Sequence, residues 1–327
     1  MTDLPITLVS GLYDHLLPLY TGEVKPEGVD LRFEVNEDPR DIFDRMAKGD
    51  GFEACEISCS EYMTQIAAGE RRFVALPVFP ARTFRHGFIA VNKKAGIGSP
   101  KDLEGKRVGV SLYTISAAVY IRGLLQHDHG VDLSKIRWVQ GSPEHAGQFG
   151  DPTVMPLLKD LPIENNQSGK SLNSLLETNE IAAMIGARLP SSLGRHPDVE
   201  RLFPDYENVE RDYYRRTGIF PIMHAVGLRR DIHERHPFVA RSLYKAFCAA
   251  KDLAMKRLRE RGASPYMLPW VRPEIESLTA LFGEDFWPYG LQSNRRTLDA
   301  LMTYLVEQSM IAESLSMKDI FVGEGAV

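Results

Sequence analysis

The chain has 327 residues, which is enough for one large domain or for two lobes with their own buried cores. Its hydrophobic content of 43%, charged content of 25% and formal net charge of -5 are ordinary for a soluble globular protein, and no basic run suits nucleic acid. No apolar run approaches the roughly 18 residues that span a bilayer, and the N-terminus lacks the pattern of an export signal. We therefore expect a cytoplasmic protein that binds neither nucleic acid nor membrane.

Short apolar segments alternate with helical patterns over the first third of the chain. The predicted strands, rich in Val, Ile and Phe, are residues 5–11, 29–35, 52–58, 73–79 and 87–92. Residues 39–49 and 60–69 have helical spacing, and each segment ends at a glycine. This alternation predicts a mostly parallel sheet with helices on its faces.

A second unit of the same kind follows. We predict a strand within residues 99–112, a helix over 114–130, a strand over 136–141, a loop over 142–169 and a strand over 180–187. The segment 222–231 is predicted to be a strand that leads back to the first unit. After it the spacing predicts helices over 238–261, 274–283 and 295–310.

These elements predict an α/β fold of two lobes between which the chain crosses twice. Residues 1–91 and 223–327 form the predicted lobe 1, on which the C-terminal helices pack, and residues 92–222 form lobe 2. Ligand clefts form where chain segments cross between lobes, so we expect the site there.

Two predicted helices begin with hydroxyl side chains. Residues 58–61 match the S-x-x-E capping box, which predicts a helix cap or, alternatively, an anion-binding N-terminus that faces the cleft. The turn at 111–116 offers Tyr113, Thr114 and Ser116 in the same place on lobe 2, without the pattern of a phosphate-binding loop. Two such termini across a cleft would suit a small ligand with two anionic groups.

The segment 79–92, FPARTFRHGFIAVN, places Arg82, Arg85 and His86 just before a predicted strand. No acidic residue occurs between positions 76 and 101, so these cations either bridge to distant residues or bind an anionic ligand. His224 lies in an apolar run at the return crossing, where a core histidine and a catalytic one are both compatible with the sequence.

Metal and disulfide chemistry have little support in the sequence. The three cysteines are too few for a disulfide framework, and no His, Cys, Asp or Glu set has a recognisable ligand spacing. We expect no metal, although convergence of distant residues stays open. Pattern and motif alone thus predict a two-lobed binder of a small anion.

Several segments in order, among them PVFPARTFRHGFIAVN, YYRRTGIFPIMH and FWPYGLQSNRRTLDALMTYLVEQ, resemble the 4,5-dihydroxyphthalate decarboxylase family. The resemblance runs from about residue 6 to residue 321. It implies a fold similar to that of type II periplasmic substrate-binding proteins. It also implies an activity that removes one carboxyl group from a dihydroxylated phthalate without an organic cofactor.

The resemblance and the sequence patterns together give the expected residues of the site. The expected catalytic residues are Arg85, His86 and His224, and which histidine donates the proton stays open. The expected substrate-binding residues are Tyr13, His15, Glu56, Ser58, Ser60, Arg82, Tyr113, Thr114, Ser116, Arg188 and Thr217. The turns near His15 and at 111–117 depart from the family pattern, which leaves the exact aromatic substrate open.

A second hypothesis is a protein that binds an aromatic carboxylate without catalysis, either as a transporter's solute receptor or as a sensor. The fold permits both functions, because fold does not determine function. The absence of an export signal counts against the transport version. In either case the expected partner is a small aromatic carboxylate, and a homo-oligomer is left open.

Overall fold

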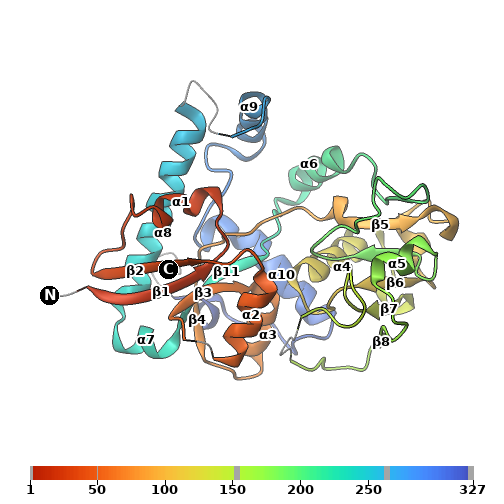
Figure 1. Cartoon of the computed structure of the whole chain (residues 1–327), viewed down its shortest axis with the longest axis horizontal. Coiled ribbons are helices and arrows are strands. Elements are labelled where there is room, and N and C mark those ends of the chain that lie inside the picture. Colours follow the sequence, from red (N-terminus) through yellow and green to blue (C-terminus); the bar gives the residue numbers. More distant parts are fainter. Residues whose placement is uncertain (1–2, 50, 151–154, 261–265, 323–327) are drawn as a thin grey trace.

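A five-stranded sheet forms the first lobe, in the order β2-β1-β3-β11-β4. Its strands are β1 (Leu4–Ser10), β2 (Val29–Val35), β3 (Ala54–Ser58), β4 (Phe73–Leu76) and β11 (His224–Arg229). The computed structural model describes residues 3–49, 51–150, 155–260 and 266–322, and the two lobes lie side by side (Figure 1).

A six-stranded sheet forms the second lobe, in the order β10-β5-β9-β6-β7-β8. Its strands are β5 (Ile89–Asn92), β6 (Arg107–Val110), β7 (Arg137–Gln140), β8 (Ile163–Asn165), β9 (Ala183–Ile185) and β10 (Val199–Arg201). β8 lies within the segment predicted to be a loop, of which residues 151–154 are outside the described part of the chain. β8 (IEN) and β10 (VER) are short and largely polar, so neither leaves an apolar run in the sequence, whereas the equally short β9 lies within one.

Each sheet contains one strand that runs antiparallel to both of its neighbours. These are β11 in the first sheet and β5 in the second, while β2–β1–β3 and β9–β6–β7–β8 pair in parallel. Both are the first strand after a crossing. Parallel strands end at the lobe boundary, whereas a strand that enters from the other lobe begins there, so it must run the opposite way.

The crossing segments contact each other. An isolated antiparallel bridge joins Arg82 to Ile222, and the Met223 N–H donates to the Ala81 carbonyl at 2.9 Å. Because all of β5 pairs within the second sheet, the first crossing is complete before Ile89. The predicted end of lobe 1 at residue 91 is therefore a few residues late. The apolar run GFIAVN predicts a strand but does not indicate to which lobe the strand belongs.

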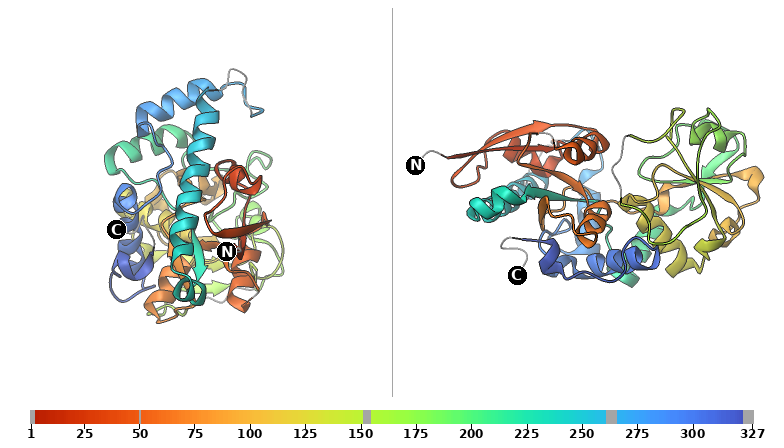
Figure 2. Two further views of the ribbon diagram at one scale, coloured as in Figure 1. Left: turned by 90° about the vertical axis from the view of Figure 1, so that its left-hand side faces the viewer. Right: turned by 90° about the horizontal axis from the view of Figure 1, so that it is seen from below.

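Helices cover both faces of the sheets (Figures 1 and 2). Lobe 1 carries α1 (Leu17–Tyr20), α2 (Pro39–Lys48), α3 (Cys59–Ala67), α7 (Arg230–Arg235) and α8 (Phe238–Glu260); lobe 2 carries α4 (Ser116–His129) and α5 (Leu172–Glu177). Capping follows the local sequence in α2, where the Asp38 carboxylate accepts from the Arg40 N–H and Gly49 ends the helix with φ of 84°.

The remaining helices connect the lobes or extend from them. They are α6 (Tyr206–Thr217), α9 (Val271–Phe282), α10 (Arg295–Glu307) and α11 (Met317–Ile320). α8 packs on lobe 1 as predicted, whereas α10 contacts both α3 and α4. A Cβ at Gly123 of α4 would lie 2.4 Å from the Tyr304 ring, so only glycine allows α10 to approach this closely.

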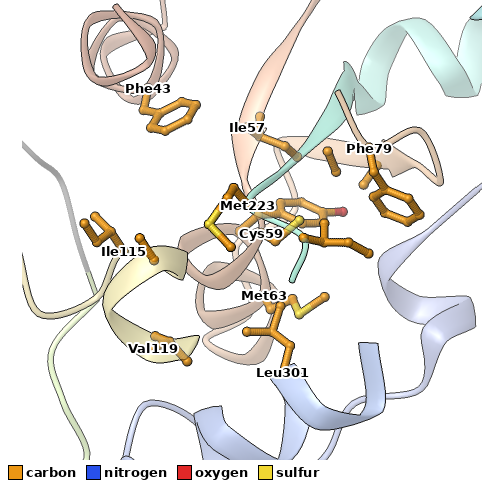
Figure 3. Packing of buried hydrophobic residues seen from close by; sticks show 14 of the residues in the cluster. Phe43, Ile57, Cys59, Met63, Phe79, Ile115, Val119, Met223 and Leu301 are labelled. Atoms are coloured by element: carbon orange, nitrogen blue, oxygen red, sulfur yellow. The ribbon is translucent and has the colours of Figure 1, made fainter. Parts of the chain in front are cut away.

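One hydrophobic cluster continues from lobe 1 into lobe 2 through α3, α4 and α10. Figure 3 shows Cys59 and Met63 of α3 near Val119 of α4 and Leu301 of α10. The lobes are thus joined by a buried apolar contact as well as by the crossing segments. No helix among the described residues is both long enough and apolar enough to cross a membrane.

Candidate active site

A cavity of about 530 Å³ lies between the lobes. It is bordered by the crossing segments, the turn after β1, the starts of α2 and α4, and one face of α8. The carboxyl end of β3 and the amino end of β11 meet at its wall, because His224 pairs with Ser58 across these two strands. Open α/β sheets place ligands at the carboxyl ends of their strands, and this cavity follows that rule.

His224 and Glu56 form a buried pair at the wall of this cavity. The Nδ1 atom of His224 contacts Oε1 of Glu56, while the carboxylate also accepts from Ser10 Oγ at 2.9 Å, Gly11 N at 3.1 Å and Tyr13 OH at 2.7 Å. Glu56 does not line the cavity itself, whereas His224 and Tyr13 do. No hydrogen bond joins His224 Nε2 to a described residue, so this nitrogen is available to a ligand.

Electrostatics keep Glu56 ionised. Burial raises the pKa of Glu56, but the opposing effects of His224, Tyr13 and the Gly11 N–H outweigh it and leave the pKa below its usual value. Burial, followed by the charge of Glu56, raises the pKa of Tyr13, so its hydroxyl stays a donor. Since a carboxylate only accepts hydrogen bonds, Nδ1 of His224 carries the hydrogen of this contact, and Nε2 is the ring nitrogen that stays free of it.

Arg82 is largely committed to the protein. Its two terminal nitrogens donate to the carbonyls of Pro288 at 3.2 Å and Phe220 at 2.9 Å, and the guanidinium lies 4.5 Å from the centre of the Phe220 ring. Nε has no partner among the described residues. Arg82 lines the cavity, but its hydrogen bonds to Phe220 and Pro288 connect the first crossing segment to two distant parts of the chain. Its main contribution is therefore to stabilise the crossing segments.

Arg85 is less engaged. Its Nε contacts the Met223 sulfur at 3.2 Å, its Nη1 donates to the Ala187 carbonyl at a long 3.4 Å, and it forms no ion pair with a carboxylate among the residues described. Only 5% of its surface is exposed, and burial lowers its pKa to about 10, which still leaves it charged at neutral pH. A buried guanidinium whose contacts are weak and include no carboxylate is able to bind an anionic ligand.

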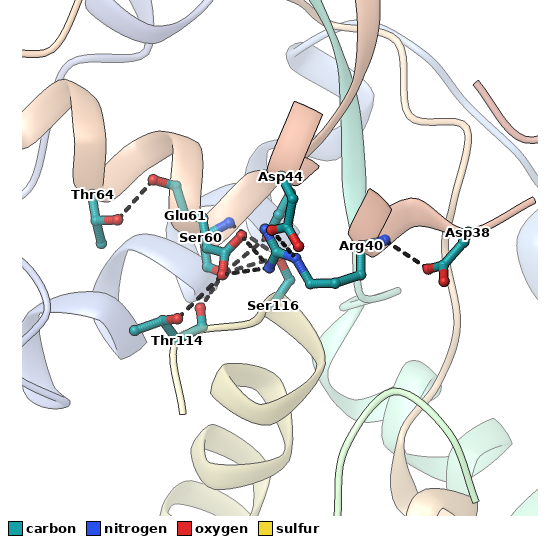
Figure 4. Close-up of polar contacts among 9 residues, drawn as sticks. Asp38, Arg40, Asp44, Ser60, Glu61, Thr64, Thr114 and Ser116 are labelled. Atoms are coloured by element: carbon teal, nitrogen blue, oxygen red, sulfur yellow. Dashed lines mark hydrogen bonds and ion pairs between the residues drawn. The ribbon is translucent and has the colours of Figure 1, made fainter. Parts of the chain in front are cut away.

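The two helix N-termini face each other as predicted, but they bind one another. Ser116 Oγ of α4 accepts from the Ser60 N–H at 3.0 Å, and Ser60 Oγ donates to the Thr114 carbonyl at 2.6 Å (Figure 4). Ser58 Oγ lies 3.2 Å from Ser116 Oγ, and only these two of the four side chains line the cavity. The hydroxyls thus join the lobes and leave Ser58 and Ser116 to meet a ligand.

An ionic group lies beside this contact. Arg40 binds Asp44 at 2.8 Å and Glu61 at 3.2 Å, and Thr114 Oγ1 of lobe 2 donates to Glu61 at 3.2 Å (Figure 4). Thr114 therefore bridges the lobes and does not reach the cavity. Glu61 uses its side chain for this bridge and not for the capping box, in which it would reach back to the helix start.

Three other predicted site residues lie outside the cavity lining. His86 is 2% exposed and packs against the rings of Phe203 and Tyr213, and burial lowers its pKa to about 4. The Tyr113 ring packs against the Arg122 guanidinium, with 3.5 Å between the ring centre and Cζ of Arg122. Thr217 donates to the Tyr213 carbonyl at the end of α6. The sequence suggested these three residues because they stand next to other candidates. In the structure, however, their side chains point away from the cavity and contact other parts of the protein.

His15 and Arg188 do line the cavity, together with residues that the sequence did not single out. His15 pairs with Asp14 at 3.0 Å and lies 5.4 Å, ring to ring, from Trp287. Lys251 of α8 is 5% exposed and is paired with Asp285. Lys251 could have been found from the sequence, because it is a single lysine within the mostly apolar run AFCAAKDLAM and lysine is seldom buried without a partner.

The described residues contain no group of three or more His, Cys, Asp or Glu side chains arranged to hold a metal ion. The acid–base groups of the cavity come instead as the pairs Glu56–His224 and Asp14–His15.

Comparison with known proteins identifies the family. The chain is 36% identical over 322 residues to a 4,5-dihydroxyphthalate decarboxylase of Comamonas testosteroni, covering 98% of this chain and 97% of the relative. The chain belongs to the 4,5-dihydroxyphthalate decarboxylase family. A second member, from Pseudomonas putida, is 38% identical over 216 residues, which are 66% of this chain and 83% of that protein. The NMT1/THI5 like family model also matches residues 25–149.

Solved structures show the same fold in binding proteins. The alkanesulfonate-binding protein SsuA of Xanthomonas axonopodis pv. citri, bound to MOPS, has a TM-score of 0.54 and 9% identity and covers 99% of this chain and 100% of its own. The periplasmic aliphatic sulphonate binding protein SsuA of Escherichia coli has a TM-score of 0.52 and 10% identity over 98% of both chains. At such low identity the likeness shows only the fold, and it confirms the predicted two-lobed α/β architecture.

Proposed function

We propose that this protein is a decarboxylase of a hydroxylated aromatic dicarboxylate, for which 4,5-dihydroxyphthalate is the first compound to test. One observation supports the proposal above all others. His224, with the buried Glu56 behind it, faces the same cavity as Arg85, which has no carboxylate partner in the described part of the chain. A proton-transfer group and an anion-binding group in one enclosed site are what this reaction needs.

Substrate binding rests on Arg85, with support from the hydroxyls of Ser58 and Ser116. The guanidinium can form two parallel hydrogen bonds to a carboxylate, which would replace its weak contacts with Met223 and Ala187. Arg82, three residues earlier in the same segment, adds positive charge but keeps its bonds to Phe220 and Pro288.

His224 supplies the proton. A hydroxyl group para to the departing carboxylate makes the ring carbon electron-rich, so that this carbon accepts a proton from Nε2 of protonated His224. The carbon–carbon bond then breaks, its electron pair returns to the ring, and CO₂ leaves with a dihydroxybenzoate as the other product. His224 is reprotonated from solvent, and the Glu56 carboxylate stabilises the imidazolium throughout. His86 has no part in this scheme, because it does not line the cavity.

The direct test is the release of CO₂ from a panel of 4,5-dihydroxyphthalate and related hydroxybenzoates. In D₂O the product should carry one deuterium at the carbon that lost its carboxyl group. Ligands that bind tightly but are recovered unchanged from every reaction would contradict the proposal and favour the binding-protein hypothesis.

A cytoplasmic location belongs to the same proposal, and the oligomeric state stays open. Cell fractionation tests the first, and light scattering of the purified protein tests the second.

A further inference from the structure

One wall of the cavity is apolar and comes mainly from α8. Lys251, Ala254, Met255 and Leu258 line the cavity at steps of three and four residues, so they form one face of the helix. Beyond Lys251 this face carries no polar group. We refer to Ala254, Met255 and Leu258, together with Tyr266, Phe286 and Trp287, as the apolar wall.

The apolar wall is separated from the proton-transfer pair by two aromatic residues. Tyr13 donates to Glu56 and contacts the ring of His15 at 5.6 Å between ring centres, and His15 in turn lies 5.4 Å from Trp287. Tyr13 and His15 thus lie between the Glu56–His224 pair and Trp287 of the apolar wall.

The apolar wall is only partly covered by protein. Met255, Leu258, Tyr266, Phe286 and Trp287 are half-buried although they line the cavity, so apolar surface remains in contact with solvent there. A cavity of about 530 Å³ is in the range of roughly 300–1,000 Å³ that holds drug-sized ligands, and it is far larger than a single-ring acid requires. The cavity thus has room for more than a single ring, and the half-buried apolar residues line part of it.

We propose that the apolar wall is a second subsite, which takes an alkyl or aryl substituent on the ring of the hydroxylated aromatic acid. This inference rests on the proposed function for the position of the ring, with its carboxylates at Arg85. It defines the substrate class as substituted hydroxyphthalates or hydroxybenzoates, of which the unsubstituted acid fills only the polar part of the cavity.

The test is a homologous series of 4,5-dihydroxyphthalates with a methyl, ethyl, propyl or butyl group at one of the two free ring positions, which are equivalent by symmetry. We expect kcat/KM to rise by about fourfold per methylene until the apolar wall is covered, which corresponds to the usual gain of about 0.8 kcal/mol for each buried methylene. A kcat/KM that stays level or falls from the first methyl group would overturn the inference.

Variants localise the effect. Leu258→Asn should reduce the ratio of kcat/KM for the butyl compound to that for the parent at least tenfold. Leu253→Asn, the same substitution on α8 but outside the cavity lining, should leave that ratio as it is. Met255→Gln provides a second cavity variant if Leu258→Asn does not fold. An unchanged ratio in a folded cavity variant, or an equal fall in the control, would contradict the subsite.

Failure of this inference can be told apart from failure of the proposed function. If no compound releases CO₂, calorimetry measures the binding of the same series to the wild-type chain. Affinity that rises with substituent length supports the subsite without the reaction, and affinity that does not rise refutes the subsite even if the parent acid is decarboxylated.

Discussion

The two arginines of one short segment show how identical side chains acquire different roles. Arg82 and Arg85 are both nearly buried, yet Arg82 donates to two carbonyls of separate segments, whereas Arg85 contacts a thioether sulfur and one distant carbonyl. The first arrangement satisfies the guanidinium, and the second leaves it able to bind an anion.

These contacts predict different outcomes for the two alanine variants. Arg85→Ala should raise KM for the dicarboxylate about ten- to a hundredfold, because a hydrogen bond to a charged group contributes roughly 1.5–3 kcal/mol. Arg82→Ala should mainly lower the urea midpoint of unfolding, since it leaves the Phe220 and Pro288 carbonyls without their donor. Steady-state kinetics and urea titration on both variants check this. An Arg82 variant with normal stability and a raised KM would reverse the assignment.

Substitution of His224 should affect catalysis more than substitution of His86, the other histidine that the sequence predicted to be catalytic. We expect His224→Asn to lose about 10²–10⁴-fold in kcat while the protein stays folded, because general acid catalysis contributes in that range. Glu56→Gln should lose part of this factor, since the imidazolium then lacks its carboxylate. Single-turnover kinetics measure both, and a kcat within a few-fold of wild type for His224→Asn would place the proton donor elsewhere.

His86 should affect stability and not catalysis. Its folded pKa of about 4 lies below the ordinary value of about 6.5, so the unfolded chain binds the extra proton first and stability is lost as pH falls from about 6.5 to 4. The shift corresponds to about 3 kcal/mol. His86→Leu should flatten this acid slope in urea titrations and keep kcat, whereas the exposed His145→Leu should keep the slope. A large loss of kcat in the first variant would restore His86 to the site.

At the scale of elements, the starts of α3 and α4 decide how the lobes meet. Each start carries hydroxyl groups that the sequence assigned to a ligand, and in the structure the Ser60 N–H and hydroxyl are taken by Ser116 and Thr114 of the other lobe. Helix N-termini with free N–H groups attract any acceptor, and here the nearest acceptor is the protein itself.

This contact predicts a specific cost for one hydroxyl. Ser116→Ala leaves the buried Ser60 N–H without an acceptor, which should lower the free energy of unfolding by about 1–3 kcal/mol. Ser111→Ala is the matched control, because the buried Ser111 hydroxyl has no partner in the described structure. Urea unfolding measures the free energy of unfolding of both variants. Equal changes would show that the contact between the helices does not contribute specifically to stability.

At the scale of the whole molecule, the two lobes are linked by crossing strands, by a continuous apolar core and by α10, which spans α3 and α4. The cavity between them collects side chains from both lobes and from the C-terminal helices, among them His224, which pairs with Glu56, and His15, which pairs with Asp14. The described residues offer no cluster of three metal ligands.

Activity should therefore survive removal of divalent metal. We expect full turnover after dialysis against a strong chelator, with well under one metal ion per chain by elemental analysis. Turnover lost to the chelator and restored by Zn²⁺, Mn²⁺ or Mg²⁺ would contradict this prediction and would recast His15 and His224 as ligands.

The sequence by itself was sufficient for the alternation of strands and helices, the two crossings and the family, because periodicity and order along the chain carry this information. It also indicated Arg85 and His224, through an arginine with no acidic neighbour and a histidine within an apolar run. Only the tertiary structure decided that Arg82, Ser60 and Thr114 bind protein groups, that His86 turns into the core, and that Glu56 supports His224. These facts depend on contacts between residues that are up to 206 positions apart, as for Arg82 and Pro288, and no local pattern in the chain encodes such a contact.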